Sequence, residues 1–150
     1  MKPKGKILVV GMGNLLCQDE GIGVHIIHAM ENLELPDPVE LLDIGTSTMD
    51  LFLHLEGVEK LIVIDAMEAG RIPGTIYECR PEDLLPKNEG PISLHNIGLL
   101  ESLRMAEKMG MKIDTVVIGV EPKVLDLGVE LSEEVKSKIP TIIEVVLKEC

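Results

Sequence analysis

The stretch KILVVGMGN, residues 6–14, decides the fold of this 150-residue chain. Its apolar residues run without the polar alternation of a half-exposed strand, which is typical of a strand covered on both faces in a parallel sheet. Gly11 ends the run and opens a loop that reaches Asp19. We therefore expect residues 6–10 to form a central parallel strand with a loop at its carboxyl end.

Two further apolar strands follow, and each is reached through a helical stretch. Between the first two strands, apolar residues recur at three-to-four spacing, which predicts an amphipathic helix. Connections of this length predict parallel strands joined by right-handed crossovers. The predicted elements are a helix at about 20–33, a strand at 39–44, a short helix at 48–55 and a strand at 61–66.

The second half of the chain completes one domain. A strand at 75–79 follows the third strand too closely for a helical crossover, so it can run antiparallel. A polar stretch at 81–91, a helix at 94–109, a strand at 112–120 and a helix at 132–148 come next. No repeat or linker interrupts residues 1–150. The sequence predicts a single three-layer α/β domain, in which a twisted, mostly parallel five-stranded sheet carries helices on both faces.

Composition narrows the possible partners and the compartment. A net charge of -12 argues against nucleic acid and against an anionic membrane surface, because both attract clustered Lys and Arg. The three cysteines are widely spaced and suggest neither a disulfide framework nor a metal knuckle. The apolar run at the amino terminus is too short for a signal peptide or a membrane span. We expect a cytoplasmic protein.

Polar residues lie on the loops that follow the predicted strands. In an open parallel sheet these loops converge on one edge, where ligands bind. Acids end the first loop, the second strand and the third strand, and a histidine that opens the helix after the fourth strand can reach the same edge. The candidate site residues are Glu20, Asp65 and His95, with a supporting set of Gly11, Gly13, Asn14, Asp19, Asp43 and Thr46.

Two carboxylates and an imidazole are the donor set of a cation site. They suit divalent metals such as nickel or zinc and leave coordination positions open. Each residue also has an ordinary structural alternative, since Glu20 can complement a helix dipole, Asp65 can accept bonds from nearby amides and His95 can lie at a helix start. The other histidines fall on helices away from this edge, with no acidic partner at ligand spacing. We expect solvated or packing roles for His25, His28 and His54.

The first loop disfavours two other kinds of site. Gly11 and Gly13 resemble part of a dinucleotide fingerprint, but Leu16 stands where a third small residue is needed, and acids at the helix start would repel a pyrophosphate. No GxSxG elbow is present, and Cys17 has no histidine beside it in the sequence and lies among acids that raise a thiol pKa. We expect no organic cofactor and no serine or cysteine nucleophile.

Short motifs stand at the ends of the predicted strands and at the helix starts. They are GMGN at 11–14, DEGIG at 19–23, DIGT at 43–46, VIDA at 63–66, SLHNIGL at 93–99 and GVEP at 119–122. Taken together, in their order and spacing, they resemble the motifs of the hydrogenase maturation endopeptidases over most of the chain. By motif match, the resemblance implies that Glu20, Asp65 and His95 bind the metal and that Asp65 and Glu20 are the catalytic candidates.

The resemblance also implies a reaction. Members of that family make one hydrolytic cut, which removes the carboxyl-terminal extension from the precursor of a nickel-iron hydrogenase large subunit. The implied partner is this precursor, and the implied metal is nickel carried by it. Although the family is often grouped with aspartic peptidases, the water-activating group stays open between Asp65, Glu20 and nickel acting as a Lewis acid. The alternative is a non-catalytic nickel-binding chaperone for the same subunit.

Overall fold

A computed structural model describes residues 5–84 and 94–150, which contain one five-stranded sheet in the order β2-β1-β3-β5-β4. Four strands are parallel, and β4 runs antiparallel to β5, as its short connection to β3 allows. The predicted mixed sheet is confirmed. The strands are β1 Lys6–Met12, β2 Val39–Gly45, β3 Val58–Ala66, β4 Ile76–Cys79 and β5 Asp114–Val120.

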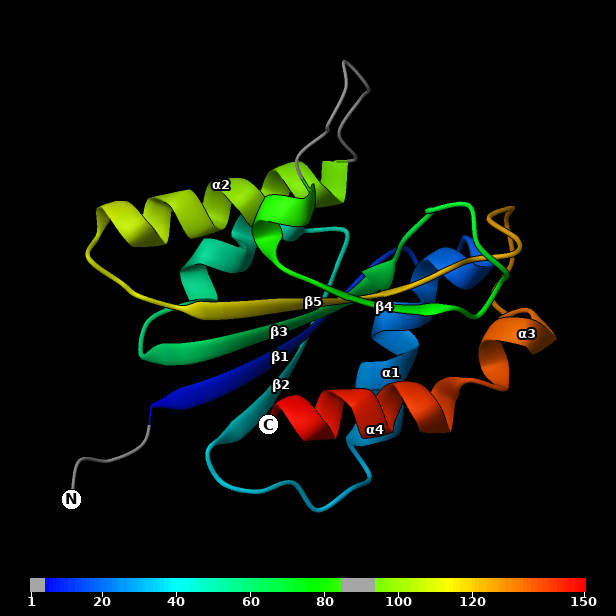
Figure 1. The fold of residues 1–150 in the computed structure, drawn as a ribbon, viewed down its shortest axis with the longest axis horizontal. Helices are drawn as coiled ribbons and strands as arrows, with labels where there is room; N and C mark the ends of the chain where they lie inside the picture. Colours follow the sequence, from blue (N-terminus) through cyan, green and yellow to red (C-terminus); the bar gives the residue numbers. More distant parts are fainter. Residues whose placement is uncertain (1–4, 85–93) are drawn as a thin grey trace.

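Helices cover both faces of the sheet and give the predicted three layers (Figure 1). The helices α1 Ile22–Met30 and α4 Ile139–Glu149 pack on one face. The helix α2 Leu94–Lys108 and the 3-10 helix η2 Thr48–His54 pack on the other. Successive strand residues point to opposite faces, so both faces need apolar side chains. This requirement explains why β1 and β3 read as unbroken apolar runs.

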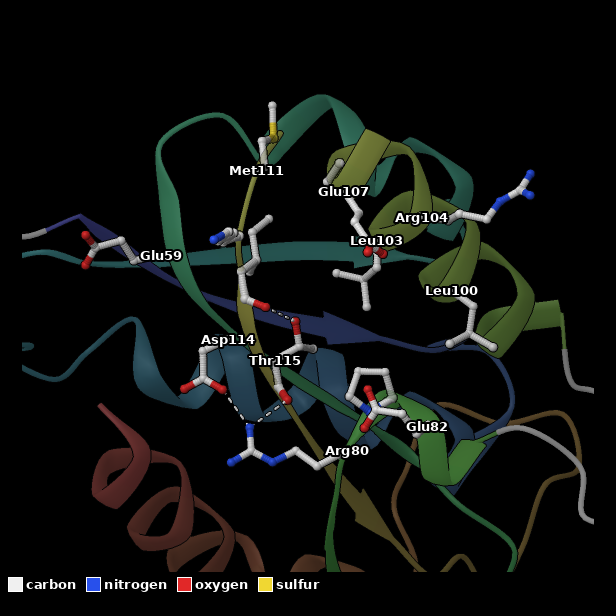
Figure 2. Close-up of a pocket in the computed structure, with 14 residues that line it drawn as sticks. Glu59, Arg80, Glu82, Leu100, Leu103, Arg104, Glu107, Met111, Asp114 and Thr115 are labelled. Atoms are coloured by element: carbon white, nitrogen blue, oxygen red, sulfur yellow. Dashed lines mark hydrogen bonds and ion pairs between the residues drawn. The ribbon is translucent and has the colours of Figure 1, made fainter. Parts of the chain in front are cut away.

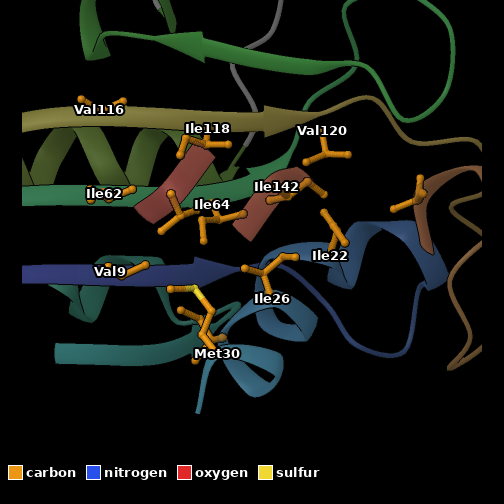
Figure 3. Close-up of a cluster of buried hydrophobic side chains, with 13 residues drawn as sticks. Val9, Ile22, Ile26, Met30, Ile62, Ile64, Val116, Ile118, Val120 and Ile142 are labelled. Carbon is orange, nitrogen blue, oxygen red and sulfur yellow. The ribbon is translucent and has the colours of Figure 1, made fainter. Parts of the chain in front are cut away.

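The face under α1 and α4 holds an apolar cluster (Figure 3). Strand residues meet helix residues such as Ile26 and Ile142 there, and these helix side chains are fully buried. Aliphatic side chains fill this core, which agrees with a chain that contains one Phe and one Tyr. The strand residues in this cluster are Val9, Ile62, Ile64, Val116, Ile118 and Val120.

The predicted helix at 20–33 is wrong at both ends. The chain first forms the 3-10 helix η1 Gln18–Gly21, and α1 then runs only to Met30. Gly21 lies so close to the backbone of residues 14 and 15 that a Cβ would sit 2.9 Å from the Cα of Leu15, which holds this turn against the preceding loop. Leu33 fits the apolar period but is 44% exposed. The apolar spacing in the sequence therefore extends beyond the end of the helix, and it predicted a helix that is too long.

The predicted helix at 132–148 is two helices, α3 Glu133–Lys136 and α4. Pro140 stands in the first turn of α4, where its missing N–H is tolerated, but it could not continue a helix from α3. The predicted cap is confirmed, because the Ser132 hydroxyl accepts a bond from the amide of Val135 at 3.4 Å.

Smaller differences concern element type and start. The predicted helix at 48–55 is the 3-10 helix η2, β3 begins three residues before the predicted 61, and β5 begins two residues after the predicted 112. Within the polar stretch predicted at 81–91, residues 81–84 form the 3-10 helix η3 Pro81–Leu84. The remainder of that stretch lies outside the described residues. None of the helices in the described part of the chain is long and apolar enough to cross a membrane.

Candidate active site

Asp65 and His95 meet at the carboxyl edge of the sheet. Asp65 ends the buried part of β3, and its Oδ1 accepts a bond from the amide of Ala66 at 2.8 Å. His95 lies in the first turn of α2, where its Nδ1 is 3.2 Å from Oδ2 of Asp65. The Asp65 residue is only 7% exposed. The predicted convergence of these two residues is therefore observed.

Glu20 joins them from the 3-10 helix η1. Its Oε1 is 3.7 Å from Nε2 of His95, and its side chain is one-third exposed at the mouth of the site. Gly13, at φ +134°, fixes this approach, because any Cβ there would collide with the backbone carbonyl of Glu20. The Gly13 amide also donates to the carbonyl of Gly45 at 2.9 Å and so ties the loops after β1 and β2 together.

Burial and charge shift the protonation of this pair. Burial raises the pKa of Asp65, and the hydrogen bond and charge of His95 only partly oppose that rise. The hydrogen bond to Asp65 raises the pKa of His95 against its own burial, and the charges of Asp65 and Glu20 add to the rise. The pair therefore holds its proton to a higher pH than isolated groups would. Shifts of this kind in a pocket are typical of functional residues.

Asp19, the residue before Glu20, holds this segment in place. Its fully buried carboxylate accepts bonds from the backbone amides of Lys123, Val124 and Ser132 at 2.8 to 3.0 Å, and from the Ser132 hydroxyl at 2.7 Å. Burial would raise the pKa of Asp19, but these four bonds outweigh it and lower the pKa. The predicted supporting residue thus joins η1 to the loop after β5.

Glu121 fixes a second segment beside the pocket. It was not among the predicted site residues. Its Oε1 accepts bonds from the amides of Ala69 and Arg71 at 2.8 and 3.1 Å and from the Tyr77 hydroxyl at 2.6 Å. These bonds fasten the chain that follows Asp65 to the end of β5. The motif GVEP placed Glu121 at the correct edge, but its partners lie about fifty residues earlier and no local spacing predicts them.

Asp43 and Thr46 do not join the pocket. Asp43 is directed at α1, where its Oδ2 lies 3.1 Å from Nε2 of His28, so His28 has an acidic partner that the sequence did not predict. Thr46 is exposed and does not line the pocket. The expectation that three acidic groups meet at this edge is therefore wrong for Asp43.

The other residues of the first loop are structural. Gly11 lies against the carbonyl of Gly23 in α1, and Asn14 Oδ1 accepts a bond from the amide of Leu16 at 2.9 Å. Burial, together with the charge and hydrogen bonding of Glu20, raises the pKa of the Cys17 thiol. This rise disfavours the thiolate form, which a cysteine nucleophile needs.

A pocket of about 570 Å³ contains the three candidate residues, together with Asn96, Leu99 and Leu125. A larger cavity of about 1030 Å³ opens between α2, η3 and the amino end of β5 (Figure 2). Arg80 there binds Asp114 at 2.6 Å and the carbonyl of Thr115 at 3.2 Å. Its lining contains no histidine and none of the motif residues, so its greater volume does not indicate the chemistry.

No group of three or more His, Cys, Asp or Glu side chains in the described residues is disposed to hold a metal ion by itself. At the candidate site the reason is geometric. Asp65 approaches one ring nitrogen of His95 and Glu20 approaches the other, so one metal cannot bind all three as they stand. The arrangement suits a proton on the ring between two carboxylates. A metal would have to displace that proton and draw Glu20 across.

Comparison with known proteins places these residues in context. A family model described as hydrogenase maturation protease matches residues 24–149, which include Asp65 and His95. The hydrogenase 2 maturation protease of Escherichia coli is 37% identical over 147 residues, covering 95% of this chain and 88% of that protein. The solved structure of the hydrogenase maturating endopeptidase HybD from Escherichia coli has a TM-score of 0.86 at 34% identity, covering 96% and 91% of the chains. HybD from Thermococcus kodakarensis has a TM-score of 0.79 at 26% identity, covering 96% and 98%.

Proposed function

Because this chain belongs to the hydrogenase maturation protease family, we propose that Glu20, Asp65 and His95 recognise nickel carried by its substrate. The chain is a peptidase that processes the carboxyl terminus of a hydrogenase large-subunit precursor. The observation that carries the proposal is that two carboxylates and an imidazole, from three distant segments, meet in one pocket.

An incomplete donor set fits recognition better than permanent storage of a metal. Asp65 Oδ2 and His95 Nδ1, 3.2 Å apart, are about as far apart as two ligands each about 2.1 Å from one metal. Glu20 is more exposed and lies beyond hydrogen-bond distance of the ring, so its side chain can swing to join them. Nickel already bound by thiolates of the precursor would complete its coordination here, and the scissile bond would be positioned by that contact.

Hydrolysis needs a base near the scissile carbonyl. A carboxylate takes a proton from water, the hydroxide adds to the carbonyl carbon, the C–N bond breaks, and the proton passes to the leaving amine. Asp65 suits this role, because burial raises its pKa and a more basic carboxylate accepts a proton more readily. Glu20, at the mouth, would then act mainly on the metal. We place this reaction in the cytoplasm, with support from the three free cysteines.

Mass measurement separates a protease from the alternative, a non-catalytic nickel chaperone. The purified precursor, loaded with nickel, is incubated with the wild-type chain, and intact mass spectrometry follows it over time. We expect the precursor to lose a single carboxyl-terminal peptide. Transfer of nickel to the precursor without any loss of mass would instead support the chaperone and contradict the proposed function.

A further inference from the structure

The loop after β5 and the loop after β1 together present leucines and a valine to solvent. Leu16, Leu125, Leu127 and Val129, here called the apolar rim, are 60%, 39%, 85% and 65% exposed. Backbone bonds join the two loops, since the Gly128 amide donates to the carbonyl of Leu16 and the Gln18 amide donates to that of Gly128, both at 2.9 Å. The rim is therefore continuous across the two loops.

Buried polar contacts hold the rim in place. The carboxylate of Asp19 accepts bonds from both ends of the second loop, at Lys123 and Val124 on one side and at Ser132 on the other. These bonds fix both ends of the loop, and Leu127 and Val129 between them are exposed. A group of neighbouring apolar side chains that is held exposed to water is a candidate interaction surface.

The rim borders the candidate active site. Leu125 lines the same pocket as Glu20, Asp65 and His95. A pocket of about 570 Å³ is in the size range of small-molecule sites, so only a short segment of a protein substrate can enter it. The remainder of that substrate must lie against the surface beside the pocket, where the exposed charged residues Lys123, Asp126 and Glu130 alternate along the loop with the rim residues.

We propose that the apolar rim docks the folded body of the precursor large subunit, against an apolar surface next to its carboxyl-terminal extension. This inference rests on the proposed function and adds the surface through which the enzyme holds its substrate. The rim would contribute to binding and not to the chemical step, because none of its side chains carries a proton-transferring or metal-binding group.

Steady-state cleavage of the nickel-loaded precursor tests the rim. Leu127→Asp is the main variant, and Met109→Asp is the matched control, because Met109 is 69% exposed just beyond the far end of α2. We expect Leu127→Asp to raise KM about tenfold or more with kcat within about twofold, since a buried leucine contributes that much to association. Both variants should keep the thermal midpoint of the wild type, since both side chains lie mostly in water.

The outcomes distinguish failure of docking from failure of the proposed function. A wild-type KM in Leu127→Asp, or an equal rise in Met109→Asp, would overturn the docking proposal while cleavage itself stands. A wild-type chain that sediments as a dimer, and a Leu127→Asp variant that sediments as a monomer, would overturn it in favour of a second copy of this chain. A precursor that the wild type leaves intact would overturn both proposals.

Discussion

His95 lies between two carboxylates, one from the 3-10 helix η1 after β1 and one from the end of β3. One ring nitrogen lies 3.2 Å from Asp65 and the other lies 3.7 Å from Glu20. The carboxylates differ in setting, because Asp65 is almost fully buried and Glu20 is one-third exposed. The site therefore pairs a buried acid on a strand with a more exposed acid on a 3-10 helix.

Replacing Asp65 or His95 should abolish processing without unfolding the chain. Asp65→Asn keeps the shape of the side chain but removes the base and a metal donor, and His95→Ala removes the imidazole. Each should lower the rate of precursor cleavage at least about a hundredfold. The matched control is Asp114→Asn, at the opposite end of β5, which should cleave at the wild-type rate. Full activity in both site variants would remove Asp65 and His95 from the mechanism.

Glu121 should make stability fall in acid. Burial raises its pKa, but the bonds from Tyr77, Ala69 and Arg71 outweigh that and hold the pKa below its ordinary value. The folded state then binds the proton less tightly than the unfolded state, so this stability is present above pH ~4.5 and is lost as pH falls through the lower folded pKa.

Urea unfolding at pH 7 and at pH 4 measures this contribution of Glu121. Glu121→Gln should lower the free energy of unfolding at pH 7 by about 1–3 kcal/mol, because three bonds to a charged acceptor are weakened. The variant should also lose less stability than the wild type between the two pH values. An equal loss in both proteins would show that Glu121 does not titrate as described.

At the scale of elements, α1 lies unusually close to the sheet through two glycines. A Cβ on Gly11 would meet the helix backbone at Gly23, and a Cβ on Gly23 would collide with the carbonyl of Ile64 and sit 2.8 Å from the amide of Met12. This contact presses the start of α1 onto β1 and β3. Since Glu20 directly precedes that helix turn, the same contact sets its distance from His95.

Gly23→Ala should therefore destabilise the fold and weaken cleavage. The obstacles are backbone atoms that cannot rotate away, and we expect a loss of about 3 kcal/mol in the free energy of unfolding. Gly57→Ala is the control, since its Cβ would meet nothing within 4 Å and only its φ of +77° is unfavourable for alanine. That control should lose about 1 kcal/mol. Similar losses from both substitutions would contradict the close approach of α1.

The elements show which kinds of structure the sequence predicts well. The strands β1 and β3 were predictable because burial on both faces leaves a continuous apolar run. The boundary between η1 and α1 was not, because packing of Gly21 against residues 14 and 15 decides it. The sequence could place Glu20, Asp65 and His95 at one edge of the sheet, because the loops that follow parallel strands converge there. The Asp43–His28 pair and the partners of Glu121 are long-range side-chain contacts that carry no local signal.

At the scale of the whole molecule, the loop after β5 organises the site. Asp19 attaches it to the segment that carries Glu20, and Glu121 attaches the end of β5 to the segment that follows Asp65. Residues 121–132 are thus bonded both to the segment that carries Glu20 and to the segment that follows Asp65. The same residues include most of the apolar rim. The segments that carry Glu20 and Asp65 and the proposed docking surface are thereby joined through the same connection.

The central claim is that Glu20, Asp65 and His95 recognise nickel carried by the substrate. Its most direct test compares two preparations of one precursor, nickel-loaded and nickel-free, incubated with equal amounts of enzyme and followed by intact mass spectrometry. Because the site lacks a complete metal-binding set, we predict that only the loaded precursor loses its carboxyl-terminal peptide, and that loading the nickel-free sample restores the cut. Equal cleavage of both preparations would contradict the account.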